Sequence, residues 1–308
     1  MSAGFSLVES LVAMALTLSV TGTAIALVLP ASRASMIEPE RMDVQQRARG
    51  AAEMLARDIA VAGAGPADGL GGVALADEIP VVMPRRLGAL GGDGPDVARA
   101  NAITVLTVPA LSSSTALAAV VGPSALSLEV QASASCGSAV LCGFAAGQDV
   151  LILDAGGQFD LFRITRVAGG VGTLRHHGQS LAWVYPVGAR VMPVVSRTFE
   201  WDEDARQLRQ YDGDQSDQPA VDAVSQLSFE YLGMPVAGVG ALEVMPLSTF
   251  ADGPWRGSGT TRFDADLLRV RAIRVRVTAE AADAALRPRV GRMGVTIDVA
   301  PRALGAGR

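Results

Sequence analysis

The chain has 308 residues, of which 49% are hydrophobic, and its formal net charge is −5 at pH 7. This length allows one or two ordinary folded domains with a sizeable hydrophobic core. Because the mild acidic balance provides no basic surface, nucleic-acid binding is not expected.

The chain begins with a long apolar segment. Residues 5–29 contain one charged side chain, that of Glu9. At about 1.5 Å of rise per residue, a helix of this length can cross a hydrocarbon core of about 30 Å. The segment therefore predicts a single transmembrane helix.

Two other interpretations of this segment stay open. Residues 24–26, Ala-Ile-Ala, form a small-x-small triplet of the kind at which signal peptides are cleaved. However, a secretory signal has a basic start and an apolar core of only about 7–15 residues, and residues 1–4 carry no basic side chain. The other alternative is a plain membrane anchor, which gives Glu9 no function.

Glu9 is the most informative residue of the apolar segment. An ionised carboxylate inside a membrane helix costs roughly 2.5–3.5 kcal/mol on insertion scales, so we expect a partner that neutralises it. The hexapeptide that ends at Glu9, GFSLVE at residues 4–9, resembles the processing site of type IV prepilins and type II secretion pseudopilins.

This resemblance implies a defined route of processing and assembly. In the family, a prepilin peptidase cleaves after the glycine, here between Gly4 and Phe5, and then methylates the new amino terminus on Phe5. Glu9 matches the family's characteristic acid, which is thought to meet the amine of a neighbouring subunit. The implied partners are prepilin peptidase, other minor and major pilins, and an inner-membrane assembly platform.

Elementary electrostatics agrees with this role of Glu9. Cleavage after Gly4 creates a cationic amine about one helical turn from Glu9, in the first turn of the helix, where the helix dipole favours an anion. A misplaced subunit would leave a charge unpaired in an apolar environment, which is the more costly outcome. The acid would therefore set the axial register of each subunit.

The charges that flank the apolar segment predict the opposite orientation. Lys and Arg usually mark the cytoplasmic side, yet residues 1–4 have none, whereas four arginines follow the segment at Arg33, Arg41, Arg47 and Arg49. Long downstream domains cross a membrane regardless of such charges. The distribution therefore bears on the insertion route rather than on the motif.

An amphipathic helix is predicted over residues 37–62. Apolar side chains recur there at spacings of three and four residues. Pro30 and Pro39 lie at the junction with the apolar segment, so a kink or a short break is expected. Gly63, Gly65 and Pro66 should end the helix.

Short β-branched runs separated by turn residues follow a loop over residues 65–95, in which one short strand is expected around 79–83. Strands are predicted at 103–108, 126–130, 150–153, 159–167, 191–195, 227–231, 269–278 and 295–299. Within 269–278 the apolar positions change parity, which predicts a bulge or strong twist near Ala272.

Three later segments resemble PilW-like minor pilins and the related GspJ-type pseudopilins. Residues 45–63 are similar to the helix that follows the membrane in these proteins, and residues 224–231 and 268–278 are similar to two late strands. The length of the chain favours a minor pilin over the usually shorter pseudopilin.

The two cysteines, Cys136 and Cys142, are close in sequence. We expect a disulfide between them, because in an oxidising compartment such a pair can bridge a tight loop if the Cα atoms approach within about 7 Å. Two buried thiols in a turn are the alternative. A structural zinc site is not expected, because it needs four ligands and no His or Cys cluster lies near.

Other candidate sites are few. Asp212, Asp214 and Asp217 alternate in a manner that could hold calcium, although their spacing does not match an EF-hand and a polar hairpin turn explains them as well. The adjacent His176 and His177 would point to opposite faces of a strand, which disfavours one shared metal. Residues 178–182 lack the last glycine of a hydrolase nucleophile elbow.

Together these observations predict an α+β, pilin-like protein without enzymatic activity. Its expected parts are a leader at 1–4, a transmembrane assembly helix at 5–29, an amphipathic continuation at 30–62 and a β-rich globular domain at 63–308. The resemblance implies a single-pass inner-membrane protein with a periplasmic domain, later incorporated into a pilus. The alternatives are a type II secretion pseudopilin and, in another class, a membrane-anchored or secreted binding protein or hydrolase.

Overall fold

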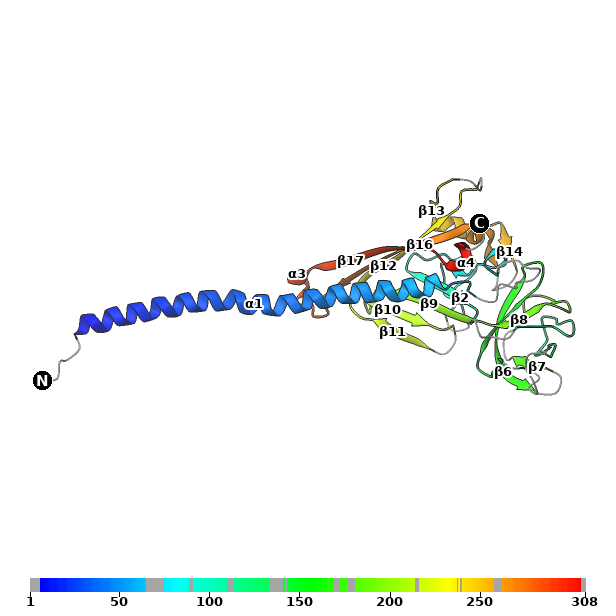
Figure 1. The fold of residues 1–308 in the computed structure, drawn as a ribbon, viewed down its shortest axis with the longest axis horizontal. Coiled ribbons are helices and arrows are strands. Elements are labelled where there is room, and N and C mark those ends of the chain that lie inside the picture. The colour runs from blue at the N-terminus through cyan, green and yellow to red at the C-terminus, as the bar shows by residue number, and fades with distance from the viewer. Residues whose placement is uncertain are drawn as a thin grey trace.

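The fold is α+β, with one long helix at the amino end followed by a β-rich globular part (Figure 1). The computed structural model describes residues 6–64, 75–88, 91–109, 114–132, 141, 143–168, 172–176, 181–213, 216–236, 238, 240–257 and 262–305, with backbone only at 29–36, 175 and 176. In Figure 1 the first half of the helix extends away from the globular part, and the second half lies along it.

Helix α1 spans Leu7–Ala60 without interruption. A kink or a short break was expected at Pro30 and Pro39; of these two, the break does not occur, because the chain stays helical through both prolines. A proline removes one hydrogen bond and tends to bend a helix, but the turns on either side keep their own bonds. The helix ends just before Gly63, whose φ of 71° suits a glycine at this position.

Two antiparallel sheets and the second half of α1 surround the main hydrophobic core. The first sheet has the order β1-β2-β9-β10-β11, with β1 at Val82–Met83, β2 at Ala102–Thr107, β9 at Val195–Asp202, β10 at Gln207–Tyr211 and β11 at Asp217–Val221. The second has the order β13-β12-β16-β17, with β13 at Glu243–Met245, β12 at Val224–Gly233, β16 at Val270–Glu280 and β17 at Arg292–Val299.

A third sheet is inserted between β2 and β9 in the sequence and has its own hydrophobic core. Its order is β3-β8-β5-β6-β7-β4, with β3 at Thr115–Ala116, β8 at Arg190–Pro193, β5 at Asp149–Leu153, β6 at Phe159–Ala168, β7 at Thr173–His176 and β4 at Ser127–Glu129. Figure 1 places this sheet at the end of the molecule farthest from the amino terminus.

The inserted sheet is joined to the rest of the molecule through β5 and β8. Because successive side chains on a strand point to opposite faces, Val150 and Ile152 enter the core of the inserted sheet, whereas Leu151 and Leu153 enter the main core.

The remaining short elements are α2 at Leu75–Glu78, η3 at Leu247–Phe250, β14 at Trp255–Arg256, β15 at Phe263–Asp264, η5 at Ala265–Arg269, α3 at Arg287–Val290 and α4 at Arg302–Gly305.

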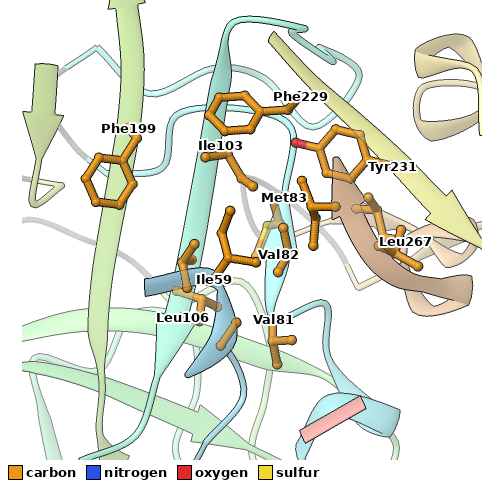
Figure 2. Packing of buried hydrophobic residues seen from close by; sticks show 14 of the residues in the cluster. Ile59, Val81, Val82, Met83, Ile103, Leu106, Phe199, Phe229, Tyr231 and Leu267 are labelled. Atoms are coloured by element: carbon orange, nitrogen blue, oxygen red, sulfur yellow. The ribbon is translucent and has the colours of Figure 1, made fainter. Parts of the chain in front are cut away.

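The second half of α1 is built into the globular part. Its buried Leu55 and Ile59 belong to the main core, and Figure 2 shows Ile59 beside Leu106 of β2. Nearer the middle of the helix, Ala48 packs against the end of β16 in a smaller cluster. Asp58 also forms an ion pair with Arg197 of β9 at 2.7 Å, so both apolar and polar contacts hold this half of the helix in place.

All of the predicted strands overlap observed ones, and the main differences lie at their ends. The run 191–195 is divided between two strands, β8 and the start of β9, and the latter continues to Asp202. The expected irregularity near Ala272 is confirmed, since β16 pairs Ala272 with Leu232 but Val270 with Gly233, which leaves Arg271 as the extra residue. The parity change seen in the sequence therefore marks a β-bulge.

Candidate functional site at the start of the long helix

Helix α1 begins with a capping box made by Ser6 and Glu9. The backbone N–H of Val8 donates to Ser6 Oγ at 3.3 Å, and the backbone N–H of Ser6 donates to Glu9 Oε2 at 3.2 Å. Ser6 has extended backbone angles, as an N-cap residue requires. Gly4 and Phe5, between which the sequence predicts cleavage, lie outside the described residues. The described part of the chain begins at the next residue, Ser6.

The capping box gives Glu9 a partner within its own chain, which the sequence interpretation had not assigned. Its signal was present in the sequence, because a Ser followed three residues later by a Glu is the pattern of such a cap. The carboxylate is exposed, and its other oxygen, Oε1, has no hydrogen-bond partner among the described residues. Glu9 can therefore cap its own helix and still accept a cation from outside.

The residues that follow Glu9 form an exposed apolar helix. The span Leu7–Val28 covers 22 residues with a mean hydropathy of 2.1, and none of it is buried in the molecule. Leu18, for example, is 73% exposed. A helix that is apolar on all sides is stable in an apolar surrounding and not in water, and this one is long enough to cross a membrane.

Three of the hydroxyl side chains within this span are satisfied locally. Thr17, Ser19 and Thr23 each donate to the carbonyl oxygen four residues earlier, at 2.7–2.8 Å. Since the hydroxyl donors of these three residues are used inside the helix, they do not oppose an apolar environment. Glu9 is therefore the one charged side chain of the span.

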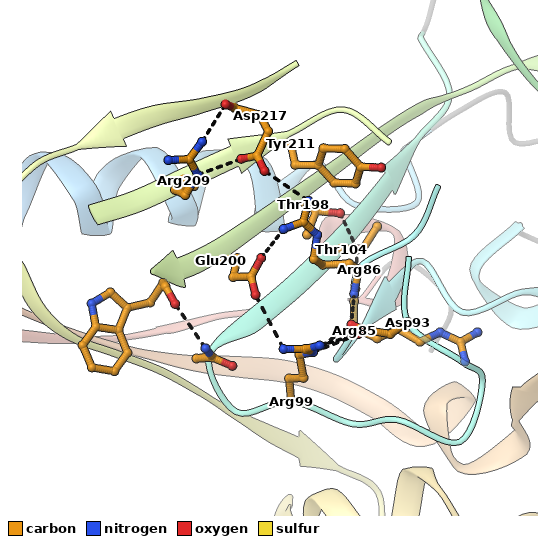
Figure 3. Close-up of polar contacts among 12 residues, drawn as sticks. Arg85, Arg86, Asp93, Arg99, Thr104, Thr198, Glu200, Arg209, Tyr211 and Asp217 are labelled. Carbon is orange, nitrogen blue, oxygen red and sulfur yellow. Dashed lines mark hydrogen bonds and ion pairs between the residues drawn. The ribbon is translucent and has the colours of Figure 1, made fainter. Parts of the chain in front are cut away.

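The acidic residues considered as calcium ligands lie at a β-hairpin. Asp212 follows β10 and Asp217 begins β11, which pairs with β10, whereas Asp214 lies outside the described residues. Asp217 accepts hydrogen bonds from Arg209 at 2.9 Å and from Arg86 at 3.3 Å (Figure 3). Partial burial raises the pKa of Asp217, but the bonds from the two arginines outweigh it and lower the pKa below its usual value.

Arg86 belongs to a wider polar network that fixes the segment before β2. It donates to Glu200 of β9 at 2.5 Å, and Glu200 also lies 3.7 Å from Arg99 (Figure 3). Arg99 in turn binds Asp93 at 2.6 Å. The carboxylates of Glu200 and Asp93 are thus paired with guanidinium groups, which is the arrangement of a structural network rather than of a cation site.

A second acidic group was not anticipated from the sequence. Oxygen atoms of Asp252, Asp264 and Asp266 lie within 4.8 Å of one another. Asp264 accepts from the backbone N–H groups of Gly253 and Asp266, at 2.6 and 2.9 Å, and Asp266 binds Arg269 at 2.7 Å. These contacts explain the group as a turn and helix-capping arrangement, and no spacing in the sequence would have revealed it.

Several sequence predictions fall outside the described residues. These include both cysteines of the expected disulfide, Cys136 and Cys142, and His177 with the start of the elbow-like segment. His176 is the last residue of β7. At the end of that segment, the backbone N–H of Ala182 donates to the buried Asp160 at 2.8 Å.

Comparison with known proteins adds no family to these observations. No protein-family model matches the chain, and no curated protein matches it. The capped, apolar helix with its single acid is therefore the feature on which a functional conclusion can rest.

Proposed function

We propose that the chain is a minor pilin of the PilW type, which assembles through α1 into a type IV pilus or its initiating tip complex. One observation carries this proposal: the exposed, predominantly apolar span Leu7–Val28 has a single charged side chain, Glu9, in the first turn of the helix, just after the Gly4-Phe5 pair. A carboxylate in such a helix is costly unless a cation meets it.

The proposed route begins in the inner membrane. A prepilin peptidase cleaves between Gly4 and Phe5 and methylates the amino group of Phe5. The apolar half of α1 then leaves the bilayer for a bundle of similar helices from minor and major pilins, while the β-rich part faces the periplasm and later the cell surface. The protein acts by assembly and is a substrate of the peptidase rather than an enzyme.

The geometry of the helix start supports this use of Glu9. Oε2 is bound to the backbone N–H of Ser6, which holds the carboxylate on the amino-terminal side of the first turn. Oε1 has no hydrogen-bond partner among the described residues and can accept a bond from an amine. A neighbouring subunit that supplies the amine at the right height satisfies the acid, and one at another height does not.

The first test is the chemical identity of the mature amino terminus. Mass spectrometry of the protein purified from membranes should find methylated Phe5 as the first residue. An unprocessed Met1, or a terminus beyond residue 26, would exclude the proposal, because the first outcome means no prepilin processing and the second means removal of the whole helix.

The second test separates the charge of Glu9 from its capping role. Glu9→Gln keeps a side-chain oxygen that can cap the helix but removes the charge, whereas Glu9→Leu removes both. Both variants should lose incorporation into pili, measured by the amount of the protein in sheared filaments. The matched control is Glu53→Gln, on the exposed side of the same helix, which should assemble normally.

Normal assembly of Glu9→Gln would show that the acid serves only as a helix cap and would contradict the proposal. The same variants also distinguish a type IV pilus from a type II secretion system. If they leave pili intact but stop type II secretion, the chain is a pseudopilin, because both machines use the same amino-terminal motif.

A further inference from the structure

Strand β17 forms one edge of the second sheet. It pairs with β16 over its whole length, from Arg292 opposite Glu280 to Val299 opposite Ile273. Its other side pairs with no strand among the described residues. Five of its eight residues are exposed and the other three are half-buried. Although α1 lies along the strand, the backbone N–H and C=O groups that face away from β16 are therefore left for the addition of another strand.

The other edges of the two main sheets are protected in ways that β17 is not. β11 contains Pro219, which cannot donate a hydrogen bond, while β1 and β13 have only two and three residues. β17 has eight residues, no proline and no charged side chain between Arg292 and Asp298. Stable proteins rarely leave such an edge uncovered in their functional state.

A row of alternating charges crosses the outer face of the sheet and ends on this edge. Glu230 of β12 lies opposite Arg274 of β16, which lies opposite Asp298 of β17. Arg274 binds Asp298 through two hydrogen bonds of 2.7 and 2.8 Å and lies 3.6 Å from Glu230. Asp298 is 48% exposed, so the order acid, base, acid stops at an accessible carboxylate.

A second charge marks the other end of the strand. Arg292 is 72% exposed and lies 3.4 Å from Glu280. Arg292 and Asp298 share the outer face, because their positions on the strand differ by an even number. On the opposite face, Val295 and Ile297 pack against the core and are only partly buried, so their outer sides remain accessible next to the open edge.

We propose that β17 binds an extended strand of another protein, in antiparallel orientation, with a basic residue opposite Asp298 and an acidic residue opposite Arg292. Backbone hydrogen bonds provide the attraction, and the two charge pairs fix the register. β-branched side chains of the added strand cover Val295 and Ile297. The antiparallel orientation continues the pattern of the sheet and is the more stable one.

A second copy of the chain fits this edge less well, although antiparallel pairing of two β17 strands would also bring Arg292 opposite Asp298. In Figure 1, β17 runs along α1. Under the proposed function, on which this step rests, the helices of all copies run the same way in one membrane or one filament, whereas two copies joined in this way would have their long helices pointing in opposite directions. The occupant is therefore a strand from a different chain.

The test uses the full chain in detergent micelles and a labelled synthetic peptide. The peptide alternates Thr and Val, with a Lys placed to meet Asp298 and a Glu placed to meet Arg292. A control peptide has the Lys and the Glu exchanged. Because each cross-strand pair contributes modestly, we expect the first peptide to bind about tenfold more tightly than the control peptide. Fluorescence anisotropy of the labelled peptides measures both affinities.

Protein variants locate the binding on β17. Arg292→Glu should weaken binding of the first peptide, and a peptide with Lys at both positions should restore it. The matched control is Arg289→Glu, an equal charge change at an exposed site on α3, which should not affect binding. Methylation of alternate peptide nitrogens should abolish binding, because it removes the backbone donors.

Three outcomes would overturn the proposal. Equal binding of the two charge arrangements would show that no register is selected, and an unchanged affinity of Arg292→Glu would place the peptide elsewhere. A dimer of the chain alone that is weakened by Arg292→Glu, seen by sedimentation, would identify the occupant as a second copy. Retention of the wild-type thermal unfolding midpoint by each variant shows that the comparison concerns folded protein.

Discussion

The two halves of α1 belong to one uninterrupted helix but have opposite surroundings. From Leu7 to Val28 apolar side chains occur on every side of the helix, and none is buried. From Val44 to Ile59 one apolar stripe is completely buried in the globular part. The same backbone geometry thus serves one half as a free apolar surface and the other as part of the core.

This difference follows from how the apolar residues are placed around each half of the helix. Small residues such as Ala48 and Ala51 allow the second half to approach the sheets closely. In the first half no such stripe exists, so the whole circumference needs an apolar surrounding. The following substitutions compare equivalent changes in the two halves.

The largest contrast is expected for the truncation of a leucine in each half. Leu55→Ala should lower the free energy of unfolding by about 2–5 kcal/mol, because it leaves a cavity in the main core. Leu16→Ala, at an exposed site, should change it by less than about 0.5 kcal/mol. Denaturant unfolding in micelles, followed by Trp fluorescence, measures both, and equal effects would contradict the division of the helix.

An added charge should affect the first half of the helix and not the second, and the affected property is membrane insertion. Leu16→Arg places a cation in the middle of the apolar span and should reduce membrane insertion by about 3 kcal/mol. Gln46→Arg, at an exposed site of the second half, should insert as the wild type does. Carbonate extraction of membranes measures the inserted fraction, and full insertion of Leu16→Arg would argue against a transmembrane role.

Overpacking should again affect only the second half. Ala48→Leu forces a larger side chain against Ala279 and Ala281, which should cost about 1–3 kcal/mol of unfolding free energy. Ala13→Leu, in the exposed half, should leave unfolding of the globular part unchanged. A neutral Ala48→Leu would mean that the helix is held less closely than described.

The smallest expected effect concerns two glycines. A methyl group at Gly50 would meet no atom within 4 Å, so Gly50→Ala should stabilise the folded state by about 0.5–1 kcal/mol through higher helix propensity. Gly22→Ala has equally open surroundings but lies outside the globular part, so the unfolding midpoint should not move. A destabilised Gly50→Ala would indicate an unseen contact on that face.

Local sequence patterns predicted the features of this molecule that depend on neighbouring residues. The apolar span, the amphipathic stripe through Leu55 and Ile59, and the bulge near Ala272 follow from spacing alone. The Ser6–Glu9 cap also has a sequence signal. Of the kink or short break expected at Pro30 and Pro39, the break does not occur, since the hydrogen bond lost at each proline did not outweigh the helical turns around it.

Features that depend on distant residues could not be predicted in this way. β11 contains Asp217 and Pro219, which local rules place in turns, and its strand conformation depends on pairing with β10. The partners Asp58 and Arg197 are 139 positions apart. Likewise, the open edge of β17 becomes visible only when the order of the strands is known.

Strands β5 and β8 connect the stabilities of the two cores. Leu151 and Met192 face the main core, while their neighbours Ile152 and Val191 face the core of the inserted sheet. A slip of one residue would turn both sets of side chains to the wrong face at once. The inserted sheet therefore cannot open by itself without exposing part of the main core, and we expect the two to unfold in a single cooperative transition.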